Sequence, residues 1–273
     1  MATVRARGIA TLRAPVGIFD AGIGSYDLVR RIRAAYPGQD VLHLADRASF
    51  PYGRKSENQL LTSVERAAGA LESMGASSII LASNAPSVTV LRPLRARTGI
   101  PILGVLPPVR EALAAMTAGR TLAVAGATVL VRSSALRRLI RDAAGNDMGR
   151  VQTVAADDLI ALVESGSFLE KSGIERSVAA FLASLRERHP RLGGLCLSST
   201  HLPWLAPAIA AQAPDLRLFD PADQVVRDFA PLATRGSGRL VCLATASSDH
   251  PIEEFLAMLE RLRLDILPTL IEL

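Results

Sequence analysis

Short apolar runs alternate along this chain with longer segments in which apolar residues recur every three or four positions. The short runs are typical of buried strands, and the longer spacing is typical of amphipathic helices. We expect strands at 16–20, 40–45, 77–83, 101–105, 121–126, 151–155, 193–199 and 240–245. We expect helices at 57–74, 107–118, 132–144 and 172–189. Strand and helix in alternation predict βαβ units, and therefore an α/β fold with mainly parallel sheets.

The composition agrees with this fold and argues against several partners. Hydrophobic residues make up 49% of the 273 residues and aromatic residues only 4%, which suits helices packed on a parallel sheet. A chain of this length can bury one large core or two smaller ones. The net charge of +5 comes from arginines spread along the chain. No aromatic residues interleave with them as a stacking platform for bases would require, so we expect no nucleic acid as a partner.

The two cysteines and the hydropathy of the chain point to the cytoplasm. Cys196 and Cys242 each lie inside an apolar run, so we expect buried, inert thiols rather than a disulfide. The first fifteen residues are basic but have no apolar core, unlike a signal peptide. No apolar stretch reaches the length of about 18 residues that a membrane span needs, and we expect no membrane partner.

Two segments repeat one pattern. Residues 77–88 (SSIILASNAPSV) and 193–205 (GGLCLSSTHLPWL) both run from small residues through an apolar strand to a serine, a polar residue and a proline. Ser83 and Ser199 are thereby placed at the carboxyl ends of strands, where open α/β sheets bind their ligands. Either cluster is also compatible with simple helix capping, or with an anion held at a helix N-terminus. Two such ends facing each other would form a cleft.

Two further turns are candidates for chemistry. In FDAGIGSYD (19–27), Asp20 ends a strand before a glycine-rich turn, which would cradle a phosphate or merely turn the chain. Asp20 itself would be a helix N-cap or a catalytic carboxylate. In PYGRKS (51–56), the turn Pro51-Tyr52-Gly53 offers backbone N–H groups to a carboxylate, and Ser56 would cap the next helix.

In order and spacing, these motifs resemble the glutamate racemases of the aspartate/glutamate racemase superfamily. That family reads FDSGVGG, PYG with a serine three residues on, CNTAS and GCTHYP, where this chain reads FDAGIGS, PYGRKS, SNAPS and SSTHLP. The likeness continues through 126–133, 157–166, 219–222 and 244–255, so it covers about residues 15 to 258.

The resemblance implies two similar three-layer α/β domains with the active-site cleft between them. One domain would be 14–105 with 220–273, and the other 106–219. Members of the family act on a free amino acid without a cofactor or a metal, through two facing cysteine thiolates. A small carboxylate or amino acid is therefore the expected ligand, and a homodimer is the default expectation.

Serine stands here at both positions of the family's catalytic cysteines, Ser83 and Ser199. A thiol has a pKa of about 8.5 that neighbours readily lower, whereas a hydroxyl needs an adjacent base. We therefore expect ordinary glutamate racemisation to be lost, and Asp20 and His201 to serve as bases beside Ser83 and Ser199. By resemblance, the substrate-binding positions are Ala21, Pro51, Tyr52, Gly53, Asn84, Ala85 and Thr200.

Several family polar groups are also missing. Ala21, Ala85, Pro107 and Leu130 stand where the family has Ser, Thr, Glu and Thr, which favours a less polar substrate. Two hypotheses follow: a cofactor-independent isomerase or lyase acting on a small carboxylate or amino acid, or a non-catalytic homologue that binds a small carboxylate or a protein partner. A slow amino-acid racemase is a further alternative.

Overall fold

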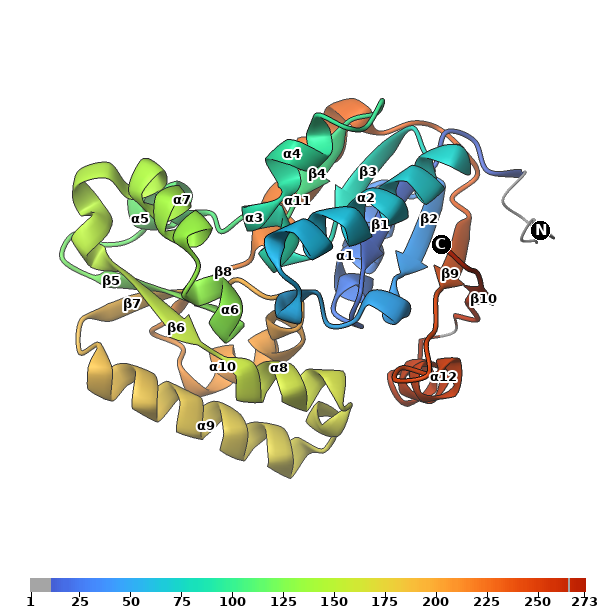
Figure 1. Ribbon diagram of the computed structural model, residues 1–273. Coiled ribbons are helices and arrows are strands. Elements are labelled where there is room, and N and C mark those ends of the chain that lie inside the picture. Colours follow the sequence, from blue (N-terminus) through green and yellow to red (C-terminus); the bar gives the residue numbers. More distant parts are fainter. Residues whose placement is uncertain (1–10, 265) are drawn as a thin grey trace. The chain divides into compact units, whose positions relative to one another are not determined.

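The computed structural model describes residues 11–264 and 266–273, and the chain forms two compact units (Figure 1). The first unit ends its first segment at Val105 and resumes at Val225, while the second unit spans Leu106–Gln224. Each unit has its own sheet, and every strand pair in both sheets is parallel. The predicted α/β class with parallel sheets is confirmed.

The first four strands of each unit follow one order in their sheet. In the described part of the chain, the first unit has a six-stranded sheet of order β10-β9-β2-β1-β3-β4, and the second has a four-stranded sheet of order β6-β5-β7-β8. Counted from the start of each unit, these four strands run second, first, third, fourth in both sheets, and the first sheet adds β9 and β10 beside β2. The strands are β1 (Val16–Asp20), β2 (Val41–Ala45), β3 (Ser78–Leu81), β4 (Ile102–Gly104), β5 (Thr121–Gly126), β6 (Val151–Ala155), β7 (Leu192–Leu197), β8 (Arg217–Phe219), β9 (Leu240–Ala244) and β10 (Thr269–Leu270).

Helices connect the strands in both units. The first unit contains α1 (Ser25–Ala35), α2 (Glu57–Ser73), α3 (Asn84–Thr89), α4 (Leu91–Arg95) and α12 (Ile252–Arg261). The second contains α5 (Val109–Ala115), α6 (Thr128–Val131), α7 (Ser134–Ala144), α8 (Asp157–Glu164), α9 (Lys171–Arg188) and α10 (Ala206–Gln212). The boundary between the units falls inside α11 (Pro221–Phe229). Short 3-10 helices are η2 (Arg47–Ser49), η3 (Tyr52–Arg54), η4 (Gly145–Arg150), η5 (Ser167–Leu169), η6 (Leu202–Leu205) and η7 (Ala230–Leu232).

The predicted strands and helices are present, with ends that differ by a few residues. β8 and β10 were not predicted, because runs of three and two residues are too short to show a period. The predicted cap at Ser56 is confirmed. Its hydroxyl accepts a hydrogen bond from the Gln59 N–H, and the Gln59 side chain accepts one from the Ser56 N–H, so two of the N–H groups at the start of α2 are paired.

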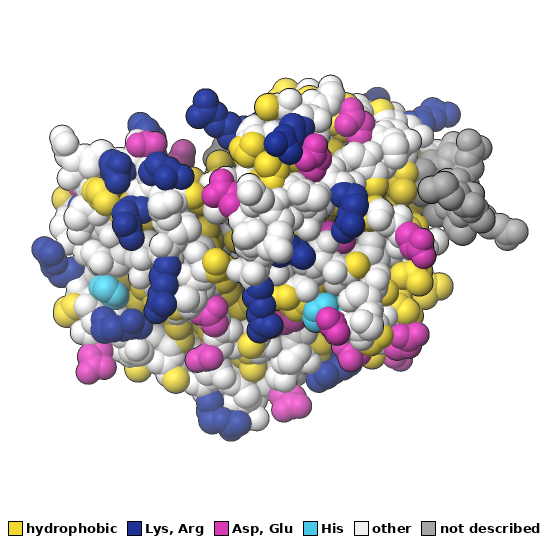
Figure 2. Space-filling view, in the orientation of Figure 1, with side chains coloured by type: hydrophobic (Ala, Val, Ile, Leu, Met, Phe, Trp, Pro, Cys, Tyr) yellow, Lys and Arg dark blue, Asp and Glu magenta, His cyan; other side chains and the backbone are white. Residues whose placement is uncertain are grey.

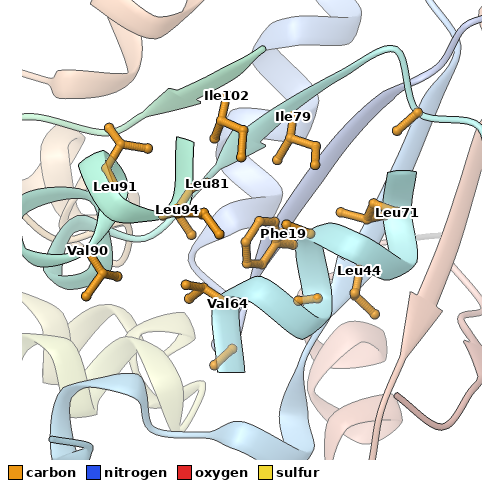
Figure 3. Close-up of a cluster of buried hydrophobic side chains, with 14 of the residues drawn as sticks. Phe19, Leu44, Val64, Leu71, Ile79, Leu81, Val90, Leu91, Leu94 and Ile102 are labelled. Atoms are coloured by element: carbon orange, nitrogen blue, oxygen red, sulfur yellow. The ribbon is translucent and has the colours of Figure 1, made fainter. Parts of the chain in front are cut away.

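One face of the first sheet packs against α2 and α4 (Figure 3). Phe19, Leu44 and Leu81 project from three neighbouring strands onto Val64 and Leu71 of α2. Burial of each such side chain contributes about 1.5–3 kcal/mol. Gly17 lets α2 come close, because a Cβ there would lie 3.1 Å from the Leu71 side chain. In the second unit, α5 and α7 lie on one side of the sheet and α8, α9 and α10 on the other (Figure 1).

The opposite face of the first sheet holds a buried polar pair under α1. His43 in β2 is fully buried, and its Nε2 lies 3.0 Å from the Ser25 Oγ. The Tyr26 ring packs on the imidazole, with 4.4 Å between ring centroids. Burial lowers the pKa of His43 to about 3, so the side chain is neutral in the folded protein at neutral pH.

The burial of both cysteines agrees with the expectation from the sequence. Cys196 and Cys242 are buried free thiols, and burial raises the pKa of each to about 12. Among the described residues, no helix is both long and apolar enough to span a membrane. Lys and Arg side chains are spread over the face drawn in Figure 2, with Asp and Glu side chains between them.

His43 should make the folded protein sensitive to mild acid. Its ordinary pKa is 6.5 and its folded pKa is about 3, so only the unfolded chain takes up this proton between those values. The stabilisation is complete above pH 6.5 and falls by about 1.4 kcal/mol per pH unit as pH drops towards 3. Urea unfolding at pH 7, 6 and 5 should show a shallower pH dependence for His43→Gln than for the wild type. His189→Gln, on an accessible helix end, is the matched control, and equal slopes for all three proteins would contradict this role.

Candidate active site

In each unit, the first and third strands are neighbours. The second strand lies beside the first and the fourth beside the third, so the strand order reverses between the first and third strands. Such a switch point leaves a crevice outside the carboxyl ends of the strands, where ligands bind. In the first unit the switch point lies between β1, which ends at Asp20, and β3. In the second it lies between β5, which ends at Gly126, and β7. Ser83 and Ser199 each stand two residues past the third strand of their unit.

The second unit joins three polar side chains at its switch point. Ser199 Oγ lies 3.3 Å from His201 Nδ1, and His201 Nε2 lies 2.7 Å from Glu164 Oε2. Ser199 and His201 are 9% and 8% exposed, and the Glu164 side chain is 16% exposed. The result is a hydroxyl–imidazole–carboxylate chain that is largely shielded from water yet reaches the surface.

The direction of these hydrogen bonds follows from the chemistry of the groups. An ionised carboxylate only accepts, so the imidazole donates from Nε2 to Glu164. In the neutral imidazole the other nitrogen, Nδ1, then has no hydrogen and accepts from the Ser199 hydroxyl. Glu164 therefore holds the ring in the tautomer whose basic nitrogen points at Ser199.

Glu164 was not predicted from the sequence. It stands at the end of α8, 37 positions before His201, and no local pattern links the two residues. Packing brings them together: α8 contacts η6, which follows His201. Phe168 of η5 also stacks edge-on against Trp204 of η6, with ring centroids 5.7 Å apart. One feature of the sequence indicated Glu164: it lies near the end of the segment 157–166, which resembles the racemase family.

The first unit presents a different set of groups at its switch point. Asp20 Oδ1 accepts a hydrogen bond from the Ala21 N–H at 2.7 Å. Ser83 precedes α3, but its side chain makes no capping hydrogen bond. Within the described chain, no hydrogen bond joins the side chains of Asp20 and Ser83 either. The first unit thus differs from the second, in which Ser199 and His201 are joined by a hydrogen bond.

Asn84 lies beside Ser83 and is 4% exposed. Its Nδ2 donates to the Val105 carbonyl at 3.2 Å, while its Oδ1 is buried and has no partner among the described residues. Leaving a buried acceptor unpaired costs about 1–3 kcal/mol. The predicted binding residue Asn84 therefore has an acceptor ready for a donor. Ala85, next along α3, is half-buried.

The Pro51-Tyr52-Gly53 turn leads into η3. The Arg54 N–H donates a hydrogen bond to the Pro51 carbonyl, and the Lys55 N–H donates one to the Tyr52 carbonyl. Tyr52 is buried, and its hydroxyl donates to Asp46 Oδ2 at 2.9 Å. Burial and the nearby carboxylates of Asp46 and Asp20 raise the pKa of Tyr52 well above its usual value.

Asp46 and Thr245, which were not predicted as site residues, lie near Tyr52 at this end of the first unit. Asp46 is fully buried and also accepts a hydrogen bond from Thr245 Oγ1 at 3.0 Å. The Asp46 N–H donates to the Asp20 carbonyl, which fixes the turn after β2 against the end of β1. Asp46 is thus a support for Tyr52.

Of the other predicted binding positions, Ala21 is buried and Thr200 is half-buried. In the described part of the chain, no group of three or more His, Cys, Asp or Glu side chains is arranged to hold a metal ion.

The fold and these sites define a class: an α/β protein of two units, with polar side chains at the switch point of each parallel sheet. Residues 25–228 match the family described as Asp/Glu/Hydantoin racemase. A glutamate racemase of Desulforudis audaxviator is 34% identical over 216 residues, 79% of this chain and 77% of the relative. One of Deinococcus radiodurans is 32% identical over 247 residues, 86% of this chain and 83% of the relative. This chain belongs to the Asp/Glu/Hydantoin racemase family.

Solved structures agree with the family assignment. Glutamate racemase from Thermus thermophilus, in complex with beta-chloro-D-alanine, is 26% identical with a TM-score of 0.75, and the match covers 95% of this chain and 96% of that one. The glutamate racemase isoform RacE1 from Bacillus anthracis shares the fold with a TM-score of 0.79 at 18% identity, over 96% of this chain and 97% of that one.

Gly126 should be necessary for the geometry of the second switch point. A Cβ at this position would lie 2.7 Å from the Ser198 carbonyl oxygen, a backbone atom one residue before Ser199. Gly126→Ala should therefore push the two strand ends apart and cost about 1–3 kcal/mol of stability. Thermal unfolding should show a fall of roughly 2–4 °C per kcal/mol. Gly149→Ala, where a Cβ meets nothing within 4 Å, is the control and should leave the melting temperature unchanged. Equal melting temperatures for the two variants would contradict the close approach.

Proposed function

We propose that this protein is a cofactor-independent isomerase or lyase that acts on a small carboxylate or amino acid, with His201 handling the proton. The observation that carries the proposal is the hydrogen-bonded chain from Ser199 through His201 to Glu164. Membership of the racemase family supports chemistry at a carbon next to a carboxylate, because the relatives above are named glutamate racemases.

The serines favour a reaction other than ordinary glutamate racemisation. By resemblance, Ser83 and Ser199 occupy the positions of the two cysteines that exchange protons with the α-carbon. A hydroxyl is far less acidic than a thiol, so it cannot form a comparable amount of its conjugate base near neutral pH. The α-hydrogen of glutamate is itself very weakly acidic. A substrate with a more acidic C–H bond, or with a group that leaves during elimination, would tolerate a weaker base.

His201 is suited to supply that base. An imidazole can take up and release a proton near physiological pH. A positioned general acid–base group contributes about 10²- to 10⁴-fold to a reaction rate. Glu164 fixes the ring and stabilises the positive charge that appears when the imidazole takes up a proton. In the first unit, we assign Asp20 as a second candidate acid–base group.

The binding residues favour a ligand that carries a hydrogen-bond donor. The unpartnered Oδ1 of Asn84 would accept from an amino or hydroxyl group of the ligand. By resemblance, Thr200, which is half-buried, is a further substrate-binding position. By resemblance, Ala21, Ala85 and Leu130 each replace a polar residue, which favours a side chain less polar than that of glutamate.

Hydrogen exchange over a broad set of compounds tests the proposal without a choice of one substrate. The purified protein is incubated in deuterated water with a panel of small carboxylic acids, amino acids and hydroxy acids, and followed by NMR and mass spectrometry. We expect exchange, isomerisation, elimination or decarboxylation of at least one compound. If some compounds raise the melting temperature but none is converted, the protein is a non-catalytic binder and the proposal is wrong.

His201→Asn should lower the rate found in that screen by about 10²- to 10⁴-fold, because the general base is removed. His189→Asn is the matched control: it makes the same exchange at the end of α9, and should keep the wild-type rate. Initial rates and melting temperatures of both variants are measured together. An unchanged rate in a folded His201→Asn variant would remove His201 from the mechanism.

A further inference from the structure

We propose that Ser199 is also an activated nucleophile, which takes the acyl group from activated esters of small carboxylic acids and releases it to water. This activity goes beyond the isomerase or lyase function and does not depend on it, because the reacting atom is the Ser199 oxygen rather than a substrate carbon acid. It uses only side chains of the second unit.

A serine hydroxyl becomes a nucleophile when a base lies within hydrogen-bond reach and a third group orients that base. All three are present here: the hydroxyl of Ser199, the imidazole of His201 at 3.3 Å and the carboxylate of Glu164 at 2.7 Å from the far nitrogen. The residues come from the turn after β7 and from the end of α8. The hydrogen bond to Glu164 leaves the lone pair of Nδ1 directed at the hydroxyl.

The described chain contains a second serine–imidazole pair, which lacks the orienting carboxylate and is also fully buried. Ser25 Oγ lies 3.0 Å from His43 Nε2, closer than the two atoms in the pair of Ser199 and His201. Both Ser25 and His43 are 0% exposed, and His43 Nδ1 has no partner among the described residues. That ring therefore has no orienting carboxylate within the described chain, and burial keeps reagents away from the hydroxyl. The pair is an internal control for the effect of access and orientation.

Apolar side chains lie at the end of the sheet from which Ser199 projects, because Leu130 approaches Gly126 beside the Ser198 carbonyl. The neighbouring strand β5 leads into α6, whose Val129 is 47% exposed while Leu130 is buried. The approach of Gly126 to the Ser198 carbonyl keeps the two strand ends together. An apolar side chain at this end of the sheet would contact an apolar acyl group more favourably than a charged one.

The reaction proceeds in two balanced steps. The Ser199 Oγ attacks the ester carbonyl carbon while His201 Nδ1 takes the hydroxyl proton. The bond from that carbon to the leaving oxygen breaks, and the imidazolium returns the proton to the leaving group. Water then attacks the acyl-serine with His201 as base, which releases the carboxylic acid and restores the Ser199 hydroxyl.

Two reagents test the proposal on the full chain: p-nitrophenyl acetate for turnover and a small alkyl fluorophosphonate for trapping. Intact-mass and peptide mass spectrometry should find one adduct per chain, at Ser199. Ser199→Ala should abolish that adduct, and His201→Asn should slow labelling by about 100-fold or more. Ser25→Ala should label like the wild type.

Glu164 acts through His201 as a positioning residue, so its variants need a separate readout. Glu164→Gln keeps an acceptor oxygen and should slow labelling less than Glu164→Leu, while both keep the wild-type melting temperature. Equal labelling rates for wild type, Gln and Leu would overturn the orienting role.

Three outcomes would overturn the proposal: no adduct at Ser199, an adduct on His201 in its place, or undiminished acetate release by Ser199→Ala. None of them bears on hydrogen exchange in deuterated water, so failure here and failure of the proposed isomerase or lyase function are distinguishable.

Discussion

The parallel pairing of the first and third strands in each unit is the constraint on which the candidate site depends. It aligns Phe19 with Leu81 in one sheet and Ala125 with Leu197 in the other. The residues that follow each aligned pair then leave the sheet side by side. Ser83 and Ser199 each lie two residues beyond these strand ends.

A local irregularity sets this alignment in the second unit. Thr121 pairs with Leu192 and Leu122 pairs with Gly194, so Gly193 is one extra residue in β7. Because side chains alternate between the faces of a strand, a shift of one residue decides which face each later side chain takes. The bulge therefore contributes to where Ser199 and His201 point.

The two units use one strand order but carry different chemistry. The second unit holds an imidazole that a carboxylate orients, while the first holds Asp20, the unpaired Oδ1 of Asn84 and the hydrogen bond between Tyr52 and Asp46. The fold is that of the racemase family, and the side chains at the strand ends determine the reaction.

Much of this arrangement could be predicted from the sequence. Apolar runs located the main strands, and the repeated pattern placed Ser83 and Ser199 just after the carboxyl ends of two of them. Glu164, Asp46 and the bulge at Gly193 could not be predicted. Each depends on contacts between residues far apart in the chain, such as Glu164 and His201. A local sequence pattern does not show which distant residues pack together. The pairing of Asp20 with Ser83 was expected from their roles, but neighbouring strand ends do not by themselves produce a hydrogen bond.

We propose that two hydroxyls do not replace two thiolates at the strand ends of this fold. The most direct test of this claim is chiral analysis of L-glutamate incubated with the purified protein, with the Deinococcus radiodurans relative assayed under the same conditions. We predict that L-glutamate remains L-glutamate while the relative interconverts the enantiomers. Formation of D-glutamate at a rate comparable to that of the relative would contradict the claim.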